Sequence, residues 1–347
     1  MKKFTIEEGF SERMAKENEF FSTKPYVSYS GLNKLLYSPA LYYKHYILKQ
    51  RDDTSSVAAI EGKLIHCLLL TPDNFDKEYQ IVSDALPSDN PKKVIDTVFE
   101  HYSILKEEGT DEREDLIEFS GAILDVLADM NLYQSLKTDE QRIAKIVDVP
   151  KHLDYWFYLK NCRGKTLITQ ETYDFAKGAV EIALESIVIR KALGLITDDF
   201  NINIENHNEI ELACVLENYA FNIHGILDSL VIDHDNKLIK INDFKTTSKD
   251  LTTFKDSIEF YRYWMQVCFY VMLVKNSIYY KEDYKIEVRF LIIDCYQQIA
   301  TMLISDTTLL KWQEATKECF EKANYHLANR VFDLPYEFAQ CEGELII

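Results

Sequence analysis

Two aspartates and a lysine end two neighbouring strand-like stretches of the sequence. Asp228 comes late in the apolar stretch 221–232, and Asp243 and Lys245 end the stretch 238–245, with a turn-forming cluster between the two. Because alternate residues of a strand share a face, the second stretch places both charges on the face of its core isoleucines. Burying charges there is costly unless something compensates them, and a divalent cation would do so.

Metal-assisted hydrolysis is the chemistry that these residue types allow. Asp228 and Asp243 could hold one or two Mg²⁺ ions, which keep water ligands that can act as nucleophiles, and the carbonyl of Phe244 could add a ligand. Lys245 would position a water and stabilise negative charge. The sign of any pKa shift of Lys245 stays open, because carboxylates and a cation act in opposite directions. A structural ion pair at the end of a strand is the other interpretation.

A histidine on a second element could join the metal site. The stretch 55–70 predicts a helix in which Gly62 and His66 are four residues apart and share a face. A glycine one turn before a histidine lets another element approach the imidazole closely. His66 suits Mn²⁺ better than Mg²⁺. By itself the pattern also fits an ordinary core histidine.

A polar stripe on an apolar helix supplies two further candidates. The stretch 257–275 predicts one helix, and Gln266 and Tyr270 are one turn apart on it. Gln266 would orient a water or a phosphate, with Tyr270 supporting it or packing on the substrate. Glu209 or Glu211 could add a carboxylate from the preceding strand, and we prefer Glu211, although both also fit solvent-facing strand residues.

The surrounding elements predict an α/β fold, with a mixed central sheet flanked by helices and a helical accessory region. The expected strands are 209–216, 221–232, 238–245, 286–295 and 298–305. A long amphipathic helix is expected from 169 to 192. We expect three regions, which are an N-terminal helical part of the core (1–79), an acidic, mainly helical accessory region (80–208) and the catalytic sheet with its flanking helices (209–347).

Composition limits the classes of function. The 347 residues carry a formal net charge of −18, which argues against a protein that coats nucleic acid indiscriminately. Residues 237–285 form a locally basic part, with nine Lys/Arg and six Asp/Glu. The seven cysteines form no CxxC pair, so a zinc ribbon or iron–sulfur cluster is not expected. Their odd number and the lack of a signal-peptide pattern predict a cytoplasmic protein with reduced thiols, and no apolar run predicts a membrane span.

The order of these motifs resembles the PD-(D/E)XK nuclease superfamily, in its RecB-like branch. The motifs are Gly62-xxx-His66, Asp228, Asp243-x-Lys245 and Gln266-xxx-Tyr270. More closely, the runs SPALYYKHYI, GKLIHCLLLTPDNFDKEY and INDFKTT resemble the exonuclease VIII (RecE) type of phage and prophage exodeoxyribonuclease. The resemblance covers roughly 26–79 and 209–275. Asp243 stands where many superfamily members have Glu, although the RecE-like group also has Asp there.

This resemblance implies a Mg²⁺-dependent exodeoxyribonuclease that acts on duplex ends in phage-type recombination, with Mn²⁺ as the alternative metal. It implies 5′ to 3′ degradation, a ring-like homo-oligomer and a single-strand annealing protein as partner. The implied metal ligands are His66, Asp228, Asp243 and Phe244, and the implied catalytic residues are Asp228, Asp243, Lys245, Gln266 and Tyr270. A RecB-like endonuclease or flap nuclease is one alternative, and a catalytically silent DNA-end or protein-binding module is another.

Overall fold

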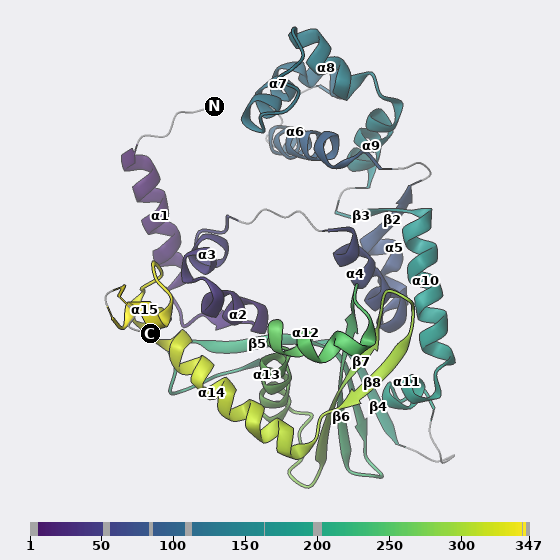
Figure 1. Cartoon of the computed structure of the whole chain (residues 1–347), viewed down its shortest axis with the longest axis vertical. Coiled ribbons are helices and arrows are strands. Elements are labelled where there is room, and N and C mark those ends of the chain that lie inside the picture. Colours follow the sequence, from purple (N-terminus) through teal and green to yellow (C-terminus); the bar gives the residue numbers. More distant parts are fainter. Residues whose placement is uncertain are drawn as a thin grey trace. The chain divides into compact units, whose positions relative to one another are not determined.

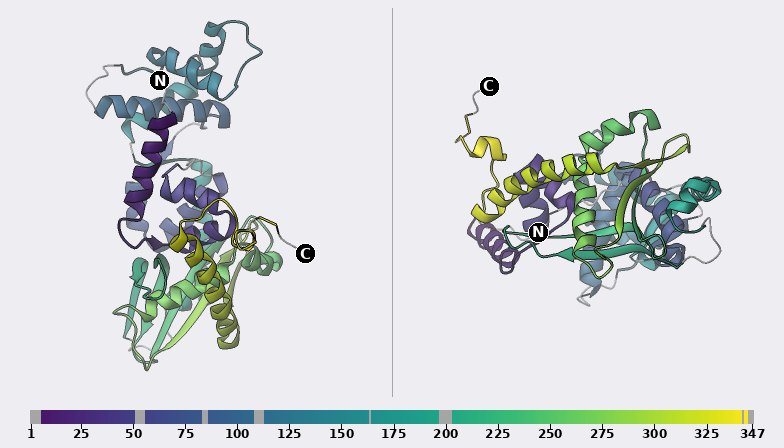
Figure 2. Two further views of the ribbon diagram at one scale, coloured as in Figure 1. Left: turned by 90° about the vertical axis from the view of Figure 1, so that its left-hand side faces the viewer. Right: turned by 90° about the horizontal axis from the view of Figure 1, so that it is seen from below.

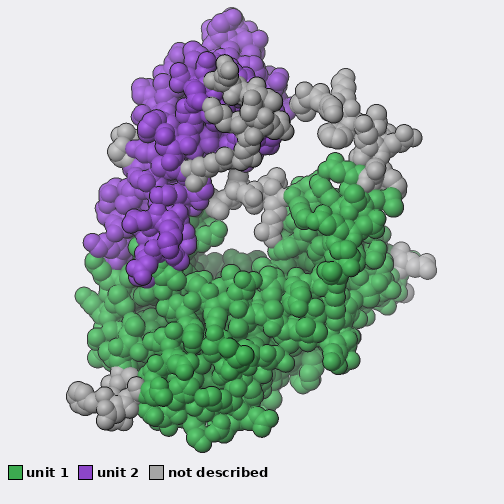
Figure 3. All heavy atoms as spheres, turned by 180° about the vertical axis from the view of Figure 1, so that it is seen from behind, with its two compact units in different colours: residues 1–71, 179–347 green, residues 72–178 purple. Residues whose placement is uncertain are grey.

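The computed structural model describes residues 6–50, 56–82, 86–107, 113–162, 164–196, 203–341 and 343–344. By their contacts, the residues form two compact units, which Figure 3 colours separately. Unit 1 comprises Met1–Thr71 and Ala179–Ile347, and unit 2 comprises Pro72–Gly178. Every residue of the predicted site lies in unit 1.

A mixed sheet forms the centre of unit 1 (Figure 1). In the described part of the chain it has six strands, in the order β1-β5-β6-β7-β8, with β4 paired to β5. Strands β4 and β6 are antiparallel to β5, β6 is parallel to β7, and β8 is antiparallel to β7. The bounds are β1 Tyr26–Val27, β4 Ile204–Cys214, β5 Asn222–Asp233, β6 Leu238–Thr246, β7 Lys285–Ile293 and β8 Ile299–Leu303.

Helices cover this sheet and carry part of the site. The apolar helix α13 (Tyr263–Lys275) packs on β4, β5 and β7, and α14 (Asp306–Asn329) packs on α13 (Figures 1 and 2). Helix α4 (Val57–Leu70) contacts β5 and β6 instead. The remaining helices of this unit are α1 Ile6–Phe20, α2 Tyr29–Tyr37, α3 Pro39–Tyr42, a π-helix Tyr43–Ile47, α11 Ile187–Ala192, a 3-10 turn Leu251–Thr253, α12 Phe254–Phe260 and α15 Tyr336–Ala339.

Unit 2 has its own apolar core. Aromatic side chains pack at its centre, and the ring centroids of Phe119 and Trp156 lie 5.3 Å apart. A two-stranded parallel ladder, β2 (Tyr79–Val82) with β3 (Thr166–Thr169), completes the unit. Its helices are 3-10 turns at Pro72–Asn74 and Leu116–Phe119, α5 Phe75–Glu78, α6 Asp89–Glu107, α7 Ser120–Asp129, α8 Asp139–Val147, α9 Pro150–Asn161 and the first part of α10 Gln170–Glu185.

The expected α/β architecture with a mixed sheet and many helices is confirmed, while two expected helices are interrupted. The expected helix 257–275 is two helices, because Arg262 adopts a left-handed backbone with φ of 54° between α12 and α13. The expected helix 169–192 ends at Glu185, and Ser186 then caps α11 by accepting a hydrogen bond from the amide of Ile189. Both interruptions are local backbone features that the apolar periodicity does not reveal.

The compact units do not share the expected region boundaries. Contacts divide the chain after Thr71 and after Gly178, whereas the sequence predicted divisions at 79/80 and 208/209. Helix α10 crosses the second division, so its amphipathic pattern gives no sign of the change of unit. Within the described residues, no helix is both long and apolar enough to span a bilayer.

Candidate active site

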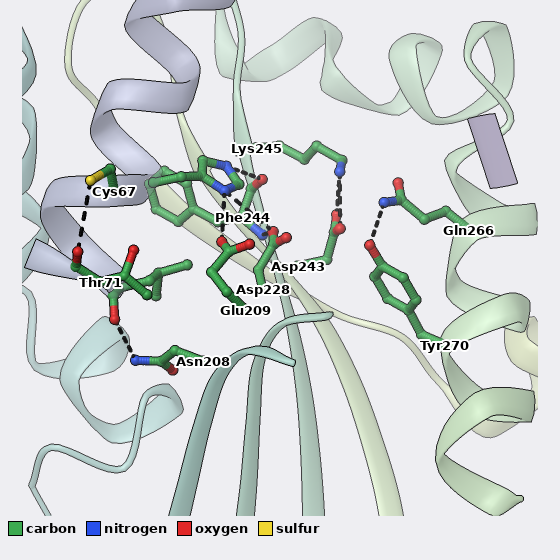
Figure 4. Close-up of polar contacts among 12 residues, drawn as sticks. Cys67, Thr71, Asn208, Glu209, Asp228, Asp243, Phe244, Lys245, Gln266 and Tyr270 are labelled. Carbon is green, nitrogen blue, oxygen red and sulfur yellow. Dashed lines mark hydrogen bonds and ion pairs between the residues drawn. The ribbon is translucent and has the colours of Figure 1, made fainter. Parts of the chain in front are cut away.

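The two aspartates face each other where the β5–β6 ladder ends. The last residue pair of the ladder is Ser229 opposite Asn242, and one step further the same register presents Asp228 and Asp243. Asp243 is fully buried and Asp228 is 9% exposed. Asp228 Oδ2 accepts a hydrogen bond of 2.6 Å from the amide of Phe244, which ties β5 to β6 at the end of their ladder (Figure 4).

Strand β5 changes the face that it presents to the core just at Asp228. Gly225 lies against Tyr270, and Leu227 belongs to the core cluster that includes α13. Beyond Asp228, Leu230 belongs to the same cluster, although in a regular strand Leu227 and Leu230 would point to opposite faces of the sheet. Regular alternation is therefore broken between Leu227 and Leu230, as at the strand irregularities that re-aim side chains next to active sites.

Glu209 lies opposite this irregularity and contributes a carboxylate. It stands opposite Asp228 in the β4–β5 register but makes no regular ladder pair, and its φ is 50°. A left-handed backbone is unfavourable for a glutamate and costs on the order of 1 kcal/mol. Glu209 Oε1 lies 3.8 Å from His66 Nδ1. The structure brings Glu209 and not the preferred Glu211 into the ligand group, because Glu211 pairs opposite Ile226, further from the end of the β5–β6 ladder.

His66 presents one ring nitrogen to the carboxylates. Its Nε2 lies 3.0 Å from the carbonyl oxygen of Phe244, so this nitrogen carries the proton that is donated. In the neutral ring Nδ1 then has a free lone pair, and it lies 3.9 Å from Asp228 Oδ2. Burial lowers the pKa of His66, but Glu209 and Asp228 outweigh burial and raise it overall.

A divalent cation fits this donor set. Ligand atoms of His66, Glu209 and Asp228 lie within 4.8 Å of one another. The two acidic side chains give hard oxygen ligands and the imidazole gives a nitrogen, a combination suited to Mn²⁺ or to Mg²⁺ with retained waters. The expected Phe244 carbonyl already accepts from His66, and its second lone pair leaves room for one further partner.

Lys245 is bound to the second aspartate. Its Nζ lies 2.9 Å from Asp243 Oδ1 and 2.7 Å from Oδ2, and 4.8 Å from the ring centroid of Tyr263. Burial lowers the pKa of Lys245, but the charges of Asp243 and Asp228 outweigh burial, and the pKa is raised overall. Lys245 is therefore a cation and cannot act as a general base in this state.

Burial and the charge of Asp243 raise the pKa of Asp228 to about 6. His66 and Lys245 oppose this rise without cancelling it. Two carboxylates in a buried space resist double ionisation, and a bound cation relieves that resistance. The geometry thus favours the binding of positive charge between β5 and β6.

Helix α13 adds a polar pair on an otherwise apolar surface. Gln266 Nε2 donates to the hydroxyl of Tyr270 at 2.7 Å, whereas its buried Oε1 has no hydrogen-bond partner among the described residues. Burial, then Asp228 and Asp243, raise the pKa of Tyr270 well above its ordinary value, so the phenol stays neutral. Gln266 Oε1 is thus a buried acceptor that a donor from a water or a substrate would satisfy.

Two glycines let the helices that carry these side chains approach the sheet. A Cβ on Gly62 of α4 would lie 2.8 Å from Thr246 Oγ1 on β6, and a Cβ on Gly225 of β5 would lie 3.1 Å from Leu273 on α13. The expected close approach beside His66 is therefore present. Gly225 was missed, because an isolated glycine in a strand carries no sign of which helix it accommodates.

The comparisons with known proteins agree with this geometry. The family model of the PD-(D/E)XK nuclease superfamily matches residues 26–342. The chain belongs to the PD-(D/E)XK nuclease superfamily. No curated protein matches the sequence significantly. The expected superfamily is confirmed, and nucleases of this superfamily typically use divalent metal ions.

Solved structures add only distant likeness. A crystal structure from Eubacterium rectale, named provisionally as an exonuclease, shares 12% identity and has a TM-score of 0.46, over 100% of this chain and 95% of that one. The structure of SSO0001 also shares 12% identity and has a TM-score of 0.23, over 65% of this chain and 84% of that one. Asp228 and Asp243-Phe244-Lys245 stay the predicted counterparts of the pattern that names the superfamily.

Asp228→Asn should stabilise the metal-free protein. Above pH 6 the ionised Asp228 carboxylate destabilises the fold, and this penalty fades as the pH falls toward the ordinary Asp value, where the folded and unfolded states are both protonated. We expect a gain of about 1–3 kcal/mol in the free energy of unfolding at pH 8, and roughly half of it at pH 5. Denaturant titration in a chelator measures it.

Asp233→Asn is the matched control, since Asp233 is also buried but accepts two hydrogen bonds of 2.9 Å from Asn236. It should destabilise the protein at both pH values. If Asp228→Asn also destabilised the protein at both pH values, the proposed like-charge repulsion would be contradicted.

Gly62→Ala should weaken metal binding about tenfold, because the added methyl group forces α4 and its His66 away from β6. Calorimetric titration with Mn²⁺ measures the affinity. Adding Thr246→Ala removes the opposing hydroxyl and should restore binding, whereas Thr246→Ser keeps that hydroxyl and should not. Equal behaviour of the two double variants would show that the close approach does not position His66.

Proposed function

We propose that this chain is a Mg²⁺-dependent exodeoxyribonuclease that hydrolyses phosphodiester bonds from the ends of duplex DNA. The observation that carries the proposal is the pair of buried carboxylates, Asp228 and Asp243, side by side at the end of one ladder with a lysine ammonium on the second. Cleavage of a phosphodiester requires an activated water and positive charge on the phosphoryl oxygens.

The residues of this chain divide these tasks. His66, Glu209 and Asp228, whose ligand atoms lie within 4.8 Å of one another, would hold the metal. Asp243, which contacts Lys245, would join them, with the Phe244 carbonyl available as a further ligand. The ion, when bound, would lower the pKa of a coordinated water and polarise the phosphate. Mg²⁺ is the proposed ion, and the imidazole ligand supports activity with Mn²⁺ as well.

In this proposal Lys245 acts on the scissile phosphate and Gln266 acts on a water. The Lys245 ammonium stabilises charge that develops on a non-bridging oxygen of the scissile phosphate. Gln266 orients a water through its free Oε1, and its amide is held in place because Nε2 donates to Tyr270. Tyr270 therefore serves as a positioning residue for Gln266.

The finer assignment rests on the sequence resemblance to the exonuclease VIII (RecE) type. We propose 5′ to 3′ degradation, a ring-like homo-oligomer and a single-strand annealing partner in phage-type recombination, all on that resemblance. We also propose a cytoplasmic setting with reduced thiols, and none of the seven cysteines, all in described residues, forms a disulfide. We propose that the acidic, mainly helical region is an accessory to the catalytic core, with its bounds moved from 80–208 to those of the compact unit Pro72–Gly178.

Digestion of end-labelled linear duplex DNA tests the activity. We expect loss of the linear substrate with Mg²⁺ or Mn²⁺ and no attack on a covalently closed circle. Asp243→Asn should reduce the rate at least a thousandfold, because it removes a ligand and unpairs Lys245. The position of the label gives the polarity. Cleavage of the circle would indicate an endonuclease, and no cleavage with any metal would indicate a silent binding module.

Lys245→Met should lower kcat by about 10²- to 10³-fold, the usual effect of removing one charge-stabilising group. Its affinity for Mn²⁺ should rise, because the ammonium no longer competes for Asp243. Parallel calorimetry and single-turnover kinetics separate the two effects. A loss of metal affinity equal to the loss of rate would contradict the assigned role of Lys245.

A further inference from the structure

A continuous row of aromatic rings leads from the ammonium of Lys245 to the protein surface. Lys245 Nζ lies 4.8 Å from the ring centroid of Tyr263, and Tyr263 stacks on Tyr261 at 5.4 Å and 25°. Tyr261 then contacts Phe260 edge to face at 4.9 Å and 90°. We name Phe260, Tyr261 and Tyr263 the aromatic row.

The outer part of this row is exposed, while its inner end is anchored in the core. Phe260 is 79% exposed and Tyr261 is 44% exposed. Tyr263 packs on Phe254 and Phe290, which are buried, with centroids 6.1 Å and 6.2 Å away. Single exposed aromatics are common on protein surfaces, but a stacked series that ends on a site residue is not explained by chance exposure.

The backbone holds the row in place at an energetic cost. Arg262, between the rings, has the left-handed φ of 54° that separates α12 from α13. Its guanidinium donates to Asn33 Oδ1 at 2.7 Å, and the carbonyl of Tyr261 accepts hydrogen bonds from the Tyr29 hydroxyl and from Asn33 Nδ2. Helix α2 therefore fixes the segment, as expected for a preorganised binding surface rather than a loose loop.

A nucleobase is the ligand whose chemistry matches an exposed aromatic surface beside a phosphate-binding lysine. Every base has a π-face, so stacking on aromatic rings binds single-stranded nucleotides without sequence preference. In a chain with net charge −18, stacking also supplies affinity that general attraction to phosphate cannot. In this row only the ring of Tyr263 stands between the lysine ammonium and the exposed ring of Tyr261, so one nucleotide end would reach from Lys245 to Tyr261.

Resting on the proposed nuclease function, we propose that Phe260 and Tyr261 hold the base of an unpaired terminal nucleotide whose phosphate lies at Lys245, with one ring stacked on the base and the other against its edge. The substrate class is therefore a frayed or single-stranded DNA end. The aromatic row gives no hydrogen-bonding specificity for the base, so all four bases are accepted. A base-free terminus would lose this contact.

Release of the first nucleotide from a linear duplex tests the platform. The compared substrates carry either a normal terminal nucleotide or a tetrahydrofuran abasic residue at the attacked end. We expect the wild type to prefer the normal end about tenfold in kcat/KM. Phe260→Ala combined with Tyr261→Ala should slow the normal end about tenfold, leave the abasic end unchanged and so abolish the preference.

Two control variants test whether the effect comes from the aromatic rings of this row. Tyr261→Phe keeps the ring and should keep the preference, because only the backbone of Tyr261 is used in the hydrogen bonds to α2. Phe338→Ala removes an aromatic side chain of similar exposure, 39%, on α15, and should change nothing. A double alanine variant that keeps the preference, or slows both ends equally, would overturn the proposal.

A cleavage-independent readout separates this proposal from the nuclease function. A 2-aminopurine at the terminal position, in Ca²⁺ without Mg²⁺, should lose fluorescence when it stacks on the wild type and keep it with the double alanine variant. Quenching without any cleavage in Mg²⁺ or Mn²⁺ would reject the nuclease function and retain the platform. Cleavage without quenching would reject the platform alone.

Discussion

The burial of two carboxylates at one point of a sheet is the constraint on which the rest of the site depends. Asp228 and Asp243 meet where β5 and β6 stop pairing, and burial together with the charge of Asp243 raises the pKa of Asp228 to about 6. The ammonium of Lys245 offsets only part of this repulsion. The remaining repulsion destabilises the fold, and a bound cation would remove it. The site residues are therefore a source of instability in the metal-free protein.

The neighbouring elements serve this point through close approaches. Gly62 lets α4 bring His66 to the end of β6, and Gly225 lets α13 bring Tyr270 against β5. Both glycines leave out side-chain volume at a helix–sheet contact, and a methyl group at Gly62 would collide with Thr246. Packing and chemistry are therefore linked, since a change of helix distance by a fraction of an ångström moves a ligand or a positioning residue.

Sequence patterns revealed the parts of the site that follow regular periods. Asp243 and Lys245 lie together because a strand repeats every two residues, and Gln266 meets Tyr270 because a helix turn spans about four. Glu209 was a candidate, but Glu211 was preferred, and the left-handed backbone that sets Glu209 apart is a local feature that strand periodicity does not predict. The left-handed backbone of Arg262, which separates α12 from α13, was likewise not predicted, because helical periodicity carries no sign of it.

Anomalous diffraction from crystals grown with Mn²⁺ tests the central claim most directly. The account predicts a peak within about 2–2.5 Å of carboxylate oxygens of both Asp228 and Asp243, with His66 or Glu209 as a further ligand. Lys245 should remain beside the ion without coordinating it. An ion bound elsewhere, or the absence of a peak at saturating Mn²⁺ while both aspartates keep their positions, would contradict the assignment of this site as a metal centre.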